Sequence, residues 1–582
     1  MEYIWTERGF RYSERDFQKF FAKTNGYLSE SLARMLMERT GGNVDAARDF
    51  LRPKWSMLHD PYLYKDMDKA INRLCKALDT GERIMIYGDY DVDGTTSVAL
   101  VYSFLSEVFF GGKQTDRLIY YVPDRYEEGY GVSEKGVLHA VSKKCTLVIA
   151  LDCGIKDNPR IDLAAQKGID FIVCDHHTPG DVLPKAFAVL DAKRPDNTYP
   201  YDELSGCGVG FKLLQALCKR RKISEKRLVE YLDLVAVSIV SDIVPMTGEN
   251  RVLAYYGIKK INTKPLTCIA AIFSNANISN KSITVEDMLF TIGPRINAAG
   301  RMKSGMEAVK LLISRDLGEA TKLACGISKQ NNERKEADRE ITESALKLLK
   351  SDPDNSKKCT TVVCGNGWHK GVVGIVASRL TETYYRPTIV LSRNGDMLTG
   401  SARSVADFNL YDAIDSCNKY LTAFGGHKFA AGLSMKAVDY DKFRADFEKY
   451  VKKHIQPHQK RPAIIIERYI SFAEITNDFY KKLQEFQPFG PENSEPVFAT
   501  CGVVNCGRSC AVGKEKPQKH LRLEVMDASG KVMVGIGFGL AEFAPILQSG
   551  AKVDICYTIT QNVFNGKASL QLMVKDIRIN KH

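Results

Sequence analysis

The feature that most constrains the fold of this 582-residue chain is an alternation of short apolar runs with helical patterns between residues 83 and 191. The runs have no polar face, which is typical of strands that helices cover on both sides. Helices are expected at 158–168 and just after residue 94, with Thr95 or Thr96 as the cap of the latter. The pattern predicts an α/β domain with a parallel sheet. The expected strands are 83–87, 118–122, 147–151, 171–174 and 186–190.

Acidic residues and histidines follow three of these runs. They are Asp89, Asp91 and Asp93 after the first run, Asp152 after the third, and Asp175, His176 and His177 after the fourth. The carboxyl ends of parallel strands meet at one edge of a sheet, so these side chains are expected to converge. So many like charges need a compensating cation, and Asp with His favours Mg²⁺ or Mn²⁺ over structural zinc. The number of carboxylates predicts two ions, the arrangement that hydrolyses phosphate esters.

Each of these residues also has a plain structural interpretation. A single Asp at the end of a strand is often a helix cap or a turn former. A calcium-binding loop is excluded, because it needs a Glu six residues after the glycine and position 100 is Leu. Asp233 is a further candidate ligand, since it lies on the otherwise apolar helix 231–236 and a metal would satisfy its charge. The alternative for Asp233 is a core carboxylate with a hydrogen-bonding partner.

The remainder of the chain divides by composition and pattern. Residues up to about 330 are mostly helical, and 331–350 is predicted to be one long helix that links two halves; a solvated helix within one domain is the alternative. A second β/α region follows, and the last ~120 residues carry short strands between Gly and Asn turns, which indicates a small antiparallel barrel. The predicted divisions are 1–60, an N-terminal segment; 61–330, a catalytic core; 331–352, a linker helix; 353–460, a second α/β domain; and 461–582, a β-barrel.

The composition is that of a folded protein, with 44% hydrophobic and 26% charged residues and a net charge of +12. No run approaches the ~18 apolar residues of a membrane helix, and the charged start MEYIWTERGF does not resemble a signal peptide. The 15 cysteines are scattered along the chain, which fits a reducing compartment. We therefore expect a cytoplasmic protein without a membrane partner.

Two further segments combine small residues with groups that bind phosphate. Arg295, Asn297 and Arg301 surround small residues in GPRINAAGR; a tight turn with structural arginines is the alternative. Gly426 and His427 in GGHK form a second set together with the Ser401 and Arg403 side chains. The glycines at 206–210 are expected to form a tight turn before a helix at 211–221 and lack the GKS or GKT sequence of a nucleotide-binding loop.

The predicted barrel is basic. Residues 497–582 contain about 11 Lys and Arg against about 6 Asp and Glu. Phe538 and Phe564 are either exposed rings on which single-stranded DNA stacks or members of the core.

Taken together, the motifs DYDVDG, LDCG, CDHH and LDLVAVSIVSDIVP resemble those of the DHH phosphoesterases, and within that family the RecJ group of single-strand-specific 5′→3′ exonucleases of DNA repair and recombination. The resemblance continues through 293–301, 368–380, 425–432 and 488–493, so it runs from about residue 50 to the end. It implies a DHH catalytic domain, a DHH-associated domain and a C-terminal OB-fold.

The resemblance also implies roles for individual residues. The implied metal ligands are Asp91, Asp93, Asp152, His176 and Asp233, with Asp152 as the bridge between two ions. Some relatives carry a His upstream of the DxD, where this chain has Ile86-Tyr87-Gly88, so Asp89 is taken as the substitute. Asp152 and His177 are the expected catalytic residues, the latter at the scissile phosphate or leaving group. The implied nucleic-acid contacts are Arg295, Asn297, Arg301, Arg379, Ser401, Arg403, Gly426 and His427.

Single-stranded DNA is the expected substrate, and a helicase and a single-strand-binding protein are partners that only the resemblance implies. One alternative is a phosphodiesterase for short oligonucleotides or cyclic dinucleotides, although such relatives lack the region 461–582. Another is a non-catalytic DNA-binding scaffold, although every acidic position of the pattern is filled here.

Overall fold

The structure is a computed structural model that describes residues 3–113, 115–278, 282–564 and 566–579, without the side chain of Phe564. The chain forms two compact units. Unit 1 comprises residues 1–53, 456–489 and 493–582, and unit 2 comprises residues 54–455 and 490–492. The N-terminal segment therefore belongs to the same compact unit as the C-terminal region.

The first sheet of unit 2 confirms the predicted parallel α/β domain. Its five strands are β2 (Ile84–Gly88), β3 (Leu118–Tyr121), β4 (Leu147–Leu151), β5 (Asp170–Cys174) and β6 (Ala188–Leu190). They lie in the order β3-β2-β4-β5-β6 and all pair in parallel. The chain moves from β2 to β3 on one side and returns to β4 on the other, so the order reverses between β2 and β4.

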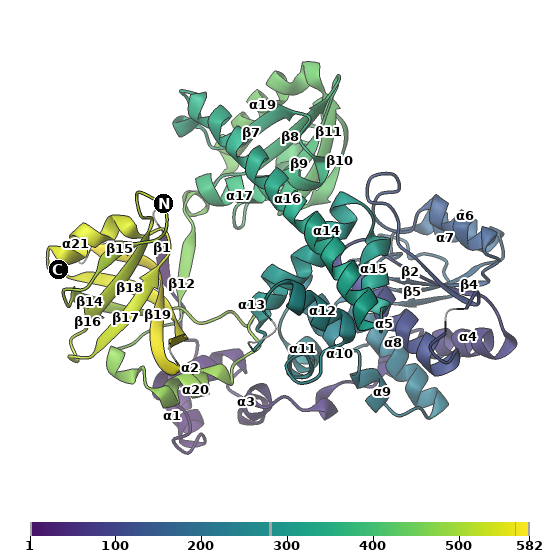
Figure 1. Ribbon diagram of the computed structural model, residues 1–582, viewed down its shortest axis with the longest axis horizontal. Helices are drawn as coiled ribbons and strands as arrows, with labels where there is room; N and C mark the ends of the chain where they lie inside the picture. Colours follow the sequence, from purple (N-terminus) through teal and green to yellow (C-terminus); the bar gives the residue numbers. More distant parts are fainter. Residues whose placement is uncertain (1–2, 114, 279–281, 565, 580–582) are drawn as a thin grey trace. The chain divides into compact units, whose positions relative to one another are not determined.

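Helices cover both faces of this sheet because its strands are apolar on both faces. Ile84, Ile86 and Leu151 point to the side that packs against α4 (Met67–Thr80), α5 (Val92–Phe109) and α8 (Gly206–Arg221). Met85, Tyr87 and Val173 point to the opposite side, which α6 (Glu134–Ser142) and α7 (Asn158–Gln166) cover (Figure 1). Alternating apolar side chains with no polar face are the physical reason for this three-layer arrangement.

Two local expectations for these helices were wrong. Helix α5 is capped by Asp91, whose carboxylate accepts the Gly94 N–H, and not by Thr95 or Thr96. Helix α8 begins at Gly206, capped by Ser205, so the glycines at 206–210 are helical and do not form a turn. They are needed there for close packing, because a Cβ on Gly206 would lie 2.6 Å from the Cβ of Asp152.

The region that follows is helical, as predicted. Its helices are α9 (Lys226–Val229), α10 (Leu232–Ser241), α11 (Gly248–Ile261), α12 (Thr267–Asn275), α13 (Val285–Asp287), α14 (Gly293–Met302) and α15 (Gly305–Ile313). A single π-helical turn at Met288–Ile292 joins α13 to α14. Helix α10 packs against both α5 and this π turn, so its C-terminal end lies near the edge of the sheet.

Helix α16 (Leu317–Ser351) is the predicted long helix, but it begins at Leu317 and not at Asn331. Asp316 caps it by accepting the Glu319 N–H. Its first half packs against α12 and α14, and its second half buries Ala345 against α17 (Lys370–Tyr384). One continuous helix therefore contacts both α/β regions of unit 2 (Figure 1).

The second sheet contains β7 (Thr361–Asn366), β8 (Thr388–Asn394), β9 (Met397–Arg403), β10 (Leu421–His427) and β11 (Ala430–Lys436), in the order β10-β11-β9-β8-β7. Only β7 and β8 pair in parallel. Helices α17, α18 (Leu410–Asp415) and α19 (Tyr440–His454) accompany it. The GGH sequence is not an open loop, because Gly425, Gly426 and His427 pair with β11 at the edge of this sheet. Gly426 has φ +149°, and a Cβ there would lie 2.3 Å from the Ala430 carbonyl oxygen.

Unit 1 contains a closed barrel of β14 (Phe498–Asn505), β16 (His520–Met526), β17 (Val532–Gly537), β18 (Val553–Phe564) and β19 (Lys567–Ile579). The pairings run β14-β18-β19-β17-β16 and return to β14. The expectation of an antiparallel barrel fails for β17 and β19, which pair in parallel. Five strands closed in this way match the OB-fold. The strand β15 (Cys510–Val512) extends the sheet beyond β16, and β13 (Arg468–Tyr469) pairs with β14.

The N-terminal residues pack on this barrel unit. The strand β1 (Ile4–Glu7) pairs in parallel with β12 (Ala463–Ile466). The helices α1 (Glu14–Ala22), α2 (Glu30–Arg39) and α3 (Val44–Leu51) share one apolar core with α20 (Asn477–Gln484), α21 (Ala544–Gln548) and the barrel. Within the described part of the chain, no helix combines the length and the apolarity needed to cross a membrane.

Candidate metal centre

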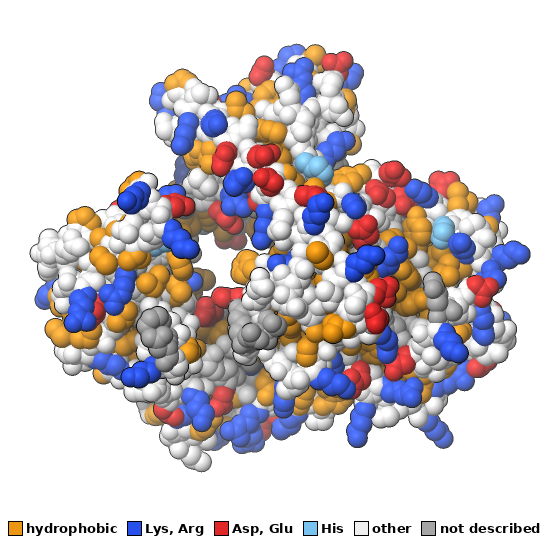
Figure 2. Space-filling view, viewed as in Figure 1, with side chains coloured by type: hydrophobic (Ala, Val, Ile, Leu, Met, Phe, Trp, Pro, Cys, Tyr) orange, Lys and Arg blue, Asp and Glu red, His pale blue; other side chains and the backbone are white. Residues whose placement is uncertain are grey.

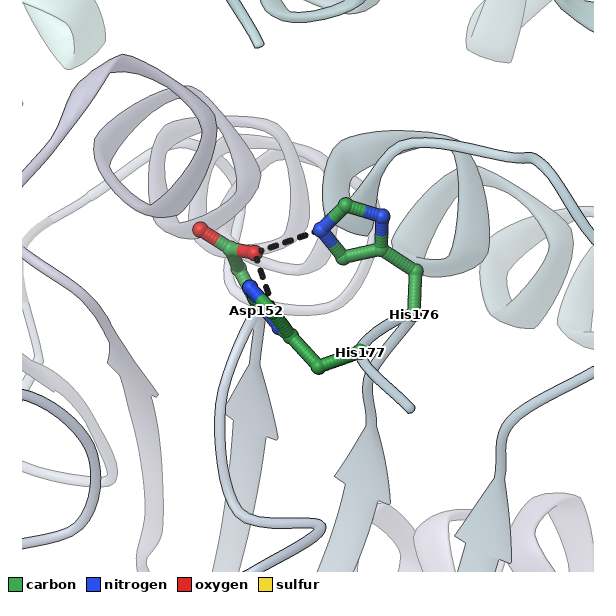
Figure 3. A group of neighbouring side chains, drawn as sticks. All are labelled: Asp152, His176 and His177. Atoms are coloured by element: carbon green, nitrogen blue, oxygen red, sulfur yellow. Dashed lines mark ion pairs between the residues drawn. The ribbon is translucent and has the colours of Figure 1, made fainter. Parts of the chain in front are cut away.

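The candidate centre lies at the carboxyl edge of the parallel sheet, next to the point where the strand order reverses. Asp89 and Asp91 follow β2, Asp152 follows β4, and His176 and His177 follow β5. Open parallel sheets bind ligands at this position because the loops on either side of the reversal diverge. Figure 3 shows Asp152 above one strand and the two histidines above its neighbour.

Two groups of side chains at this edge are close enough to share a cation. The Nε2 atom of His176 lies 3.2 Å from Asp152 Oδ1, 3.5 Å from Asp242 Oδ2 and 3.8 Å from Asp93 Oδ2. The ligand atoms of Asp152, His176 and His177 all lie within 4.8 Å of one another, as do those of Asp93, His176 and Asp242. The two groups have His176 in common, and together they form the metal cluster: Asp93, Asp152, His176, His177 and Asp242.

Asp152 is held in an unusual backbone conformation. Its φ of +58° lies in the left-handed region, which costs an L-residue free energy and persists only where the surroundings enforce it. Its N–H donates to the Cys174 carbonyl, and its own carbonyl accepts the Tyr130 hydroxyl at 3.1 Å. Gly206 provides the space for its side chain.

Asp93 is oriented by the start of helix α8. Its carboxylate accepts the N–H groups of Gly206 at 2.6 Å and Cys207 at 2.8 Å, and the Ser238 hydroxyl at 2.7 Å. The unpaired N–H groups and the dipole at a helix N-terminus stabilise a buried carboxylate. These three donors hold the Asp93 carboxylate in place, and almost none of it is exposed.

His177 is oriented by Asp175. The Asp175 carboxylate accepts the backbone N–H of His176 at 2.8 Å and that of Ile155 at 3.0 Å, and it lies 2.8 Å from Nδ1 of His177. Burial favours a raised pKa for Asp175, but the hydrogen bond and charge of His177 hold it at about 2. Burial likewise opposes the charge on His177, yet the bond to Asp175 raises the pKa of the imidazole above its ordinary value. The Nδ1 proton is thus fixed toward Asp175.

The carboxylates of the metal cluster carry more negative charge than the other residues of the cluster compensate. Burial, and then the charge of Asp93, raise the pKa values of Asp152 and Asp242 well above the ordinary range. Burial lowers the pKa of His176, and both of its ring nitrogens are buried without a hydrogen-bonding partner. Unpaired imidazole nitrogen beside crowded carboxylate oxygen is the donor set that divalent Mn²⁺ and Mg²⁺ accept. The residues present therefore fit a divalent cation.

Of the predicted ligands, Asp93, Asp152 and His176 come together in the metal cluster. Asp91 caps helix α5, and its pKa is raised first by burial and then by the nearby Asp93. Asp89 is buried with its Oδ1 unpaired, and burial and Asp91 raise its pKa, but it belongs to neither group of ligand atoms.

The structure does not bring Asp233 to the cluster. Its carboxylate pairs with Lys260 Nζ at 2.7 Å and accepts the Leu266 N–H at 2.7 Å. Asp233 starts α10 and Asp242 follows the end of that helix, so nine residues, about 13 Å along the axis, separate them. The alternative of a core carboxylate with a partner is therefore what the structure contains.

The residue that sequence reasoning missed is Asp242, although it stands in the same motif, at the end of SIVSD. Helix α10 is apolar between Asp233 and Asp242. The pairing of Lys260 with Asp233 tells the two carboxylates apart, and the sequence does not reveal it. The available signal was the end of the helix itself, since Pro245 follows within three residues and an Asp at a helix end next to a strand edge can reach the sheet.

Four arginines form a second unusual group, which we call the arginine cluster: Arg125, Arg301, Arg334 and Arg403. Burial, and the charges of the other three, lower the pKa of Arg301 to about 10. Burial and Arg125 also lower the pKa of Arg403. Arg125 lies 4.5 Å from the ring of Tyr90, which is between Asp89 and Asp91, so the arginine cluster adjoins the metal cluster. Arg125 and Arg334 were not predicted.

The other predicted nucleic-acid contacts differ in exposure and in whether they already have partners within the protein. Arg295 donates to the Thr291 carbonyl at 2.8 Å, and its Nε is buried without a partner. Arg379 is paired with Asp338 of helix α16 at 2.6 Å. Ser401 lies in β9 beside Gly374 of α17. The three remaining residues are Asn297, half-buried in α14, and Gly426 and His427, exposed in β10.

Comparison with known proteins assigns families to three regions. Residues 83–239 match the DHH family N-terminal domain, 355–453 the DHHA1 domain and 466–576 the RecJ OB domain. The single-stranded-DNA-specific exonuclease RecJ of Dickeya dadantii is 34% identical over 89% of this chain and 92% of its own length. That of Bacillus subtilis is 31% identical over 95% of this chain and 69% of its own. This chain belongs to the RecJ family.

Solved structures of the RecJ family agree with the fold. A crystal structure of RecJ from Thermus thermophilus in complex with Mn²⁺ superposes with a TM-score of 0.83 and 25% identity, over 100% of this chain and 80% of that one. A crystal structure of exonuclease RecJ bound to manganese gives a TM-score of 0.59 and 31% identity, over 69% of this chain and 98% of that one. The predicted fold class and family are therefore confirmed.

Proposed function

We propose that this chain is a two-metal-ion exonuclease that degrades single-stranded DNA in the 5′→3′ direction, in DNA repair and recombination. The observation that carries the proposal is the metal cluster, in which buried carboxylates and an unpaired imidazole converge. The names of the RecJ relatives supply the substrate and its strandedness. The arginine cluster beside it supplies a place for phosphate.

The cofactors are two divalent metal ions, Mn²⁺ or Mg²⁺. Asp93 and Asp242 would hold one ion, and Asp152 and His176 lie between the two groups and would help to hold both ions. Asp91 and Asp89 complete the acidic surroundings. When bound, such ions activate water and neutralise charge on a phosphodiester.

The protein groups supply orientation and a proton. Asp152 is the proposed bridge, and its left-handed backbone fixes its carboxylate toward His176. His177 keeps its Nδ1 proton on Asp175 and carries a raised pKa, so at neutral pH it is more readily charged than a free imidazole. A partly exposed imidazolium in this position is suited to contact the scissile phosphate and to protonate the leaving oxygen.

The arginine cluster is the proposed site for phosphates near the 5′ end. Burial and then neighbouring guanidinium groups lower the pKa values of Arg301 and Arg403, and a phosphate would offset that repulsion. Arg379 is a weaker contact because Asp338 already neutralises it. The proposed contacts are Arg125, Arg295, Asn297, Arg301, Arg334, Arg379, Ser401, Arg403, Gly426 and His427.

In unit 1 the barrel is proposed to hold the strand by base stacking. Phe538 is 64% exposed and stands edge-on to His520 at a centroid distance of 5.1 Å. The ring is solvent-accessible, as a stacking platform requires. Figure 2 shows Lys and Arg side chains spread over one face of the molecule. The side chain of Phe564 lies outside the described residues.

The cellular setting is also a proposal. The cytoplasm suits a chain whose 15 cysteines are all free thiols. A helicase that unwinds duplex and a single-strand-binding protein are proposed partners, since each handles the same single strand.

A nuclease assay tests the proposal. The substrate is a 3′-labelled, 5′-phosphorylated single strand incubated with Mn²⁺ or Mg²⁺, with a duplex and a dinucleotide in parallel. We expect nucleotides to be lost from the 5′ end of the long single strand only. Asp152→Ala should abolish the activity without unfolding, as circular dichroism checks. Preference for the dinucleotide indicates the short-substrate phosphodiesterase, and DNA binding without cleavage indicates the scaffold.

A further inference from the structure

A strained, exposed apolar residue directly follows the metal cluster. Ile243 has φ +59° and is 63% exposed. A β-branched residue in the left-handed region is strained, and Gly or Asn would fit a surface turn there without that cost. Most of the side chain also stays in contact with solvent, so burial compensates little of that strain. Backbone strain that packing does not explain is a reason to look for a function.

A second exposed apolar residue lies on the neighbouring π turn. Phe290 is 70% exposed, in the turn Met288–Ile292 that packs against α10. The contact is close, because a Cβ on Gly293 would lie 2.8 Å from Ser241 Oγ, one residue before Asp242. π turns interrupt α-helices and occur frequently at functional sites. Phe290 therefore lies near the end of α10 that carries Asp242, and Ile243 directly follows that residue.

Unpaired polar groups accompany these two side chains. The Nε of Arg295 and the hydroxyl of Ser241 are buried without a hydrogen-bonding partner. Arg295 lies at the start of α14, five residues after Phe290. An exposed ring and a guanidinium in one short segment offer one surface for a flat apolar group and another for a phosphate.

We propose that Phe290 and Ile243 form a nucleobase-contact site for the nucleotide whose phosphodiester lies at the metal cluster. The proposal rests on the proposed function and adds the base as a determinant of it. A base is tethered to its phosphate by one sugar, so apolar side chains at the edge of a phosphate-binding centre are within its reach. Phe290 stacks on the base, Ile243 contacts its edge, and Arg295 binds the adjoining phosphate.

An abasic substrate tests this contact directly. Strands that carry one tetrahydrofuran residue in place of either of the first two 5′ nucleotides are compared with the intact strand. The wild-type protein is expected to release the first nucleotide about tenfold more slowly from one of the abasic strands, within the range that one stacked base supports. Phe290→Ala should slow the intact strand to a similar extent and show no further loss on the abasic strands. Equal wild-type rates on all strands would overturn the proposal while leaving the nuclease assignment intact.

Matched variants separate a base contact from a general defect. Phe290→Trp should keep the rate on the intact strand, whereas Phe290→Leu should lose it. Val438→Ala, at an apolar position that is 81% exposed elsewhere in unit 2, should change nothing. Ile243→Asn should raise the melting temperature, because Asn tolerates the left-handed region, and yet slow cleavage. Unchanged cleavage by both Ile243→Asn and Phe290→Leu would contradict the proposal.

A binding readout makes the test independent of catalysis. In the inactive Asp152→Ala variant, 2-aminopurine at each of the first two 5′ positions reports stacking through its fluorescence. The proposal predicts a change in fluorescence on binding at one position, and its loss when Phe290→Ala is added. The same signal with and without Phe290 would refute the stacking role whether or not the protein cleaves DNA.

Discussion

Helix α10 carries a buried carboxylate at its first end and a half-buried one after its last residue, and the structure gives the two opposite roles. At the first end, Asp233 pairs with Lys260 and accepts the Leu266 N–H; both lower its pKa, although burial raises it more. At the other end, Asp242 faces Asp93 and His176, and burial and then the charges of Asp93 and Asp91 raise its pKa. A buried carboxylate with a complete set of partners stabilises the fold, whereas one without them needs a ligand.

Replacing the aspartate at either end of α10 should have the largest effects on cleavage or stability. Asp242→Ala is expected to reduce cleavage by more than the ~10–100-fold that outer-shell substitutions at metal sites cost, because it removes a ligand. Its melting temperature without metal should not fall, since the substitution relieves repulsion. Nuclease rates and thermal melts of chelator-treated protein measure both effects.

The matched variant is Asp233→Ala. It leaves Lys260 without its partner in a largely buried position, so we expect a loss of about 3–5 kcal/mol in stability with cleavage retained at permissive temperature. If Asp233→Ala removed metal-dependent cleavage in folded protein, the contrast between the two ends would be lost.

Gly206→Ala probes how the metal cluster is packed. The new Cβ would lie 2.6 Å from that of Asp152, so Asp152 must move and cleavage should fall about 10–100-fold. Gly326→Ala is the control, because that exposed position of α16 has no neighbour within 4 Å and Ala favours a helix. Steady-state rates at several Mn²⁺ concentrations are the measurement. An active Gly206→Ala enzyme would show that the edge of the sheet tolerates displacement.

A substitution of Asp191 tests whether a further carboxylate at the carboxyl edge of the first sheet lacks a compensating charge. Burial raises its pKa to about 7, against ~3.9 in an unfolded chain. Its contribution to stability is therefore fully present below the unfolded pKa and is lost as the pH rises toward 7. Asp191→Asn should stabilise the metal-free protein at pH 8, by about 2 kcal/mol, and by less at pH 5. Urea midpoints at the two pH values test this, with Asp196→Asn as the exposed control; equal gains at both pH values would contradict it.

The smallest expected effect concerns the arginines. Arg403→Ala should weaken binding of a 5′-phosphorylated single strand about tenfold, because it removes a charge that no carboxylate among the described residues pairs with. Arg379→Ala should weaken it less, since Asp338 already neutralises Arg379. Fluorescence anisotropy at several salt concentrations distinguishes the two. Equal losses would mean that pairing in the free protein does not decide which arginines bind DNA.

The same comparison explains what the sequence could and could not predict. Strand positions were predictable because a run such as 147–151 is apolar at every residue, and the convergence of Asp93, Asp152 and His176 follows from the geometry of parallel strands. Asp233 was predicted as a ligand and Asp242 was overlooked, although both stand at an end of the same apolar helix. The deciding partner, Lys260, lies on another helix, and no local pattern reveals that contact.

Other errors have the same origin in contacts between distant segments. The glycines at 206–210 are typical of a turn in the sequence. Only the close contact of Gly206 with Asp152 explains why a glycine is needed there in a helix. The arginine cluster draws Arg125, Arg301, Arg334 and Arg403 from four segments, so spacing in the sequence gave no sign of it. The parallel pairing of β17 with β19 depends on how the barrel closes.

The most direct test is a calorimetric titration of Mn²⁺ into chelator-treated protein. Wild-type protein should bind two ions, and Asp233→Asn should bind the same number. Asp242→Ala should lose at least one of them while keeping its melting temperature. Full binding by Asp242→Ala together with a lost ion in folded Asp233→Asn would place the metal at the wrong end of α10 and contradict the account.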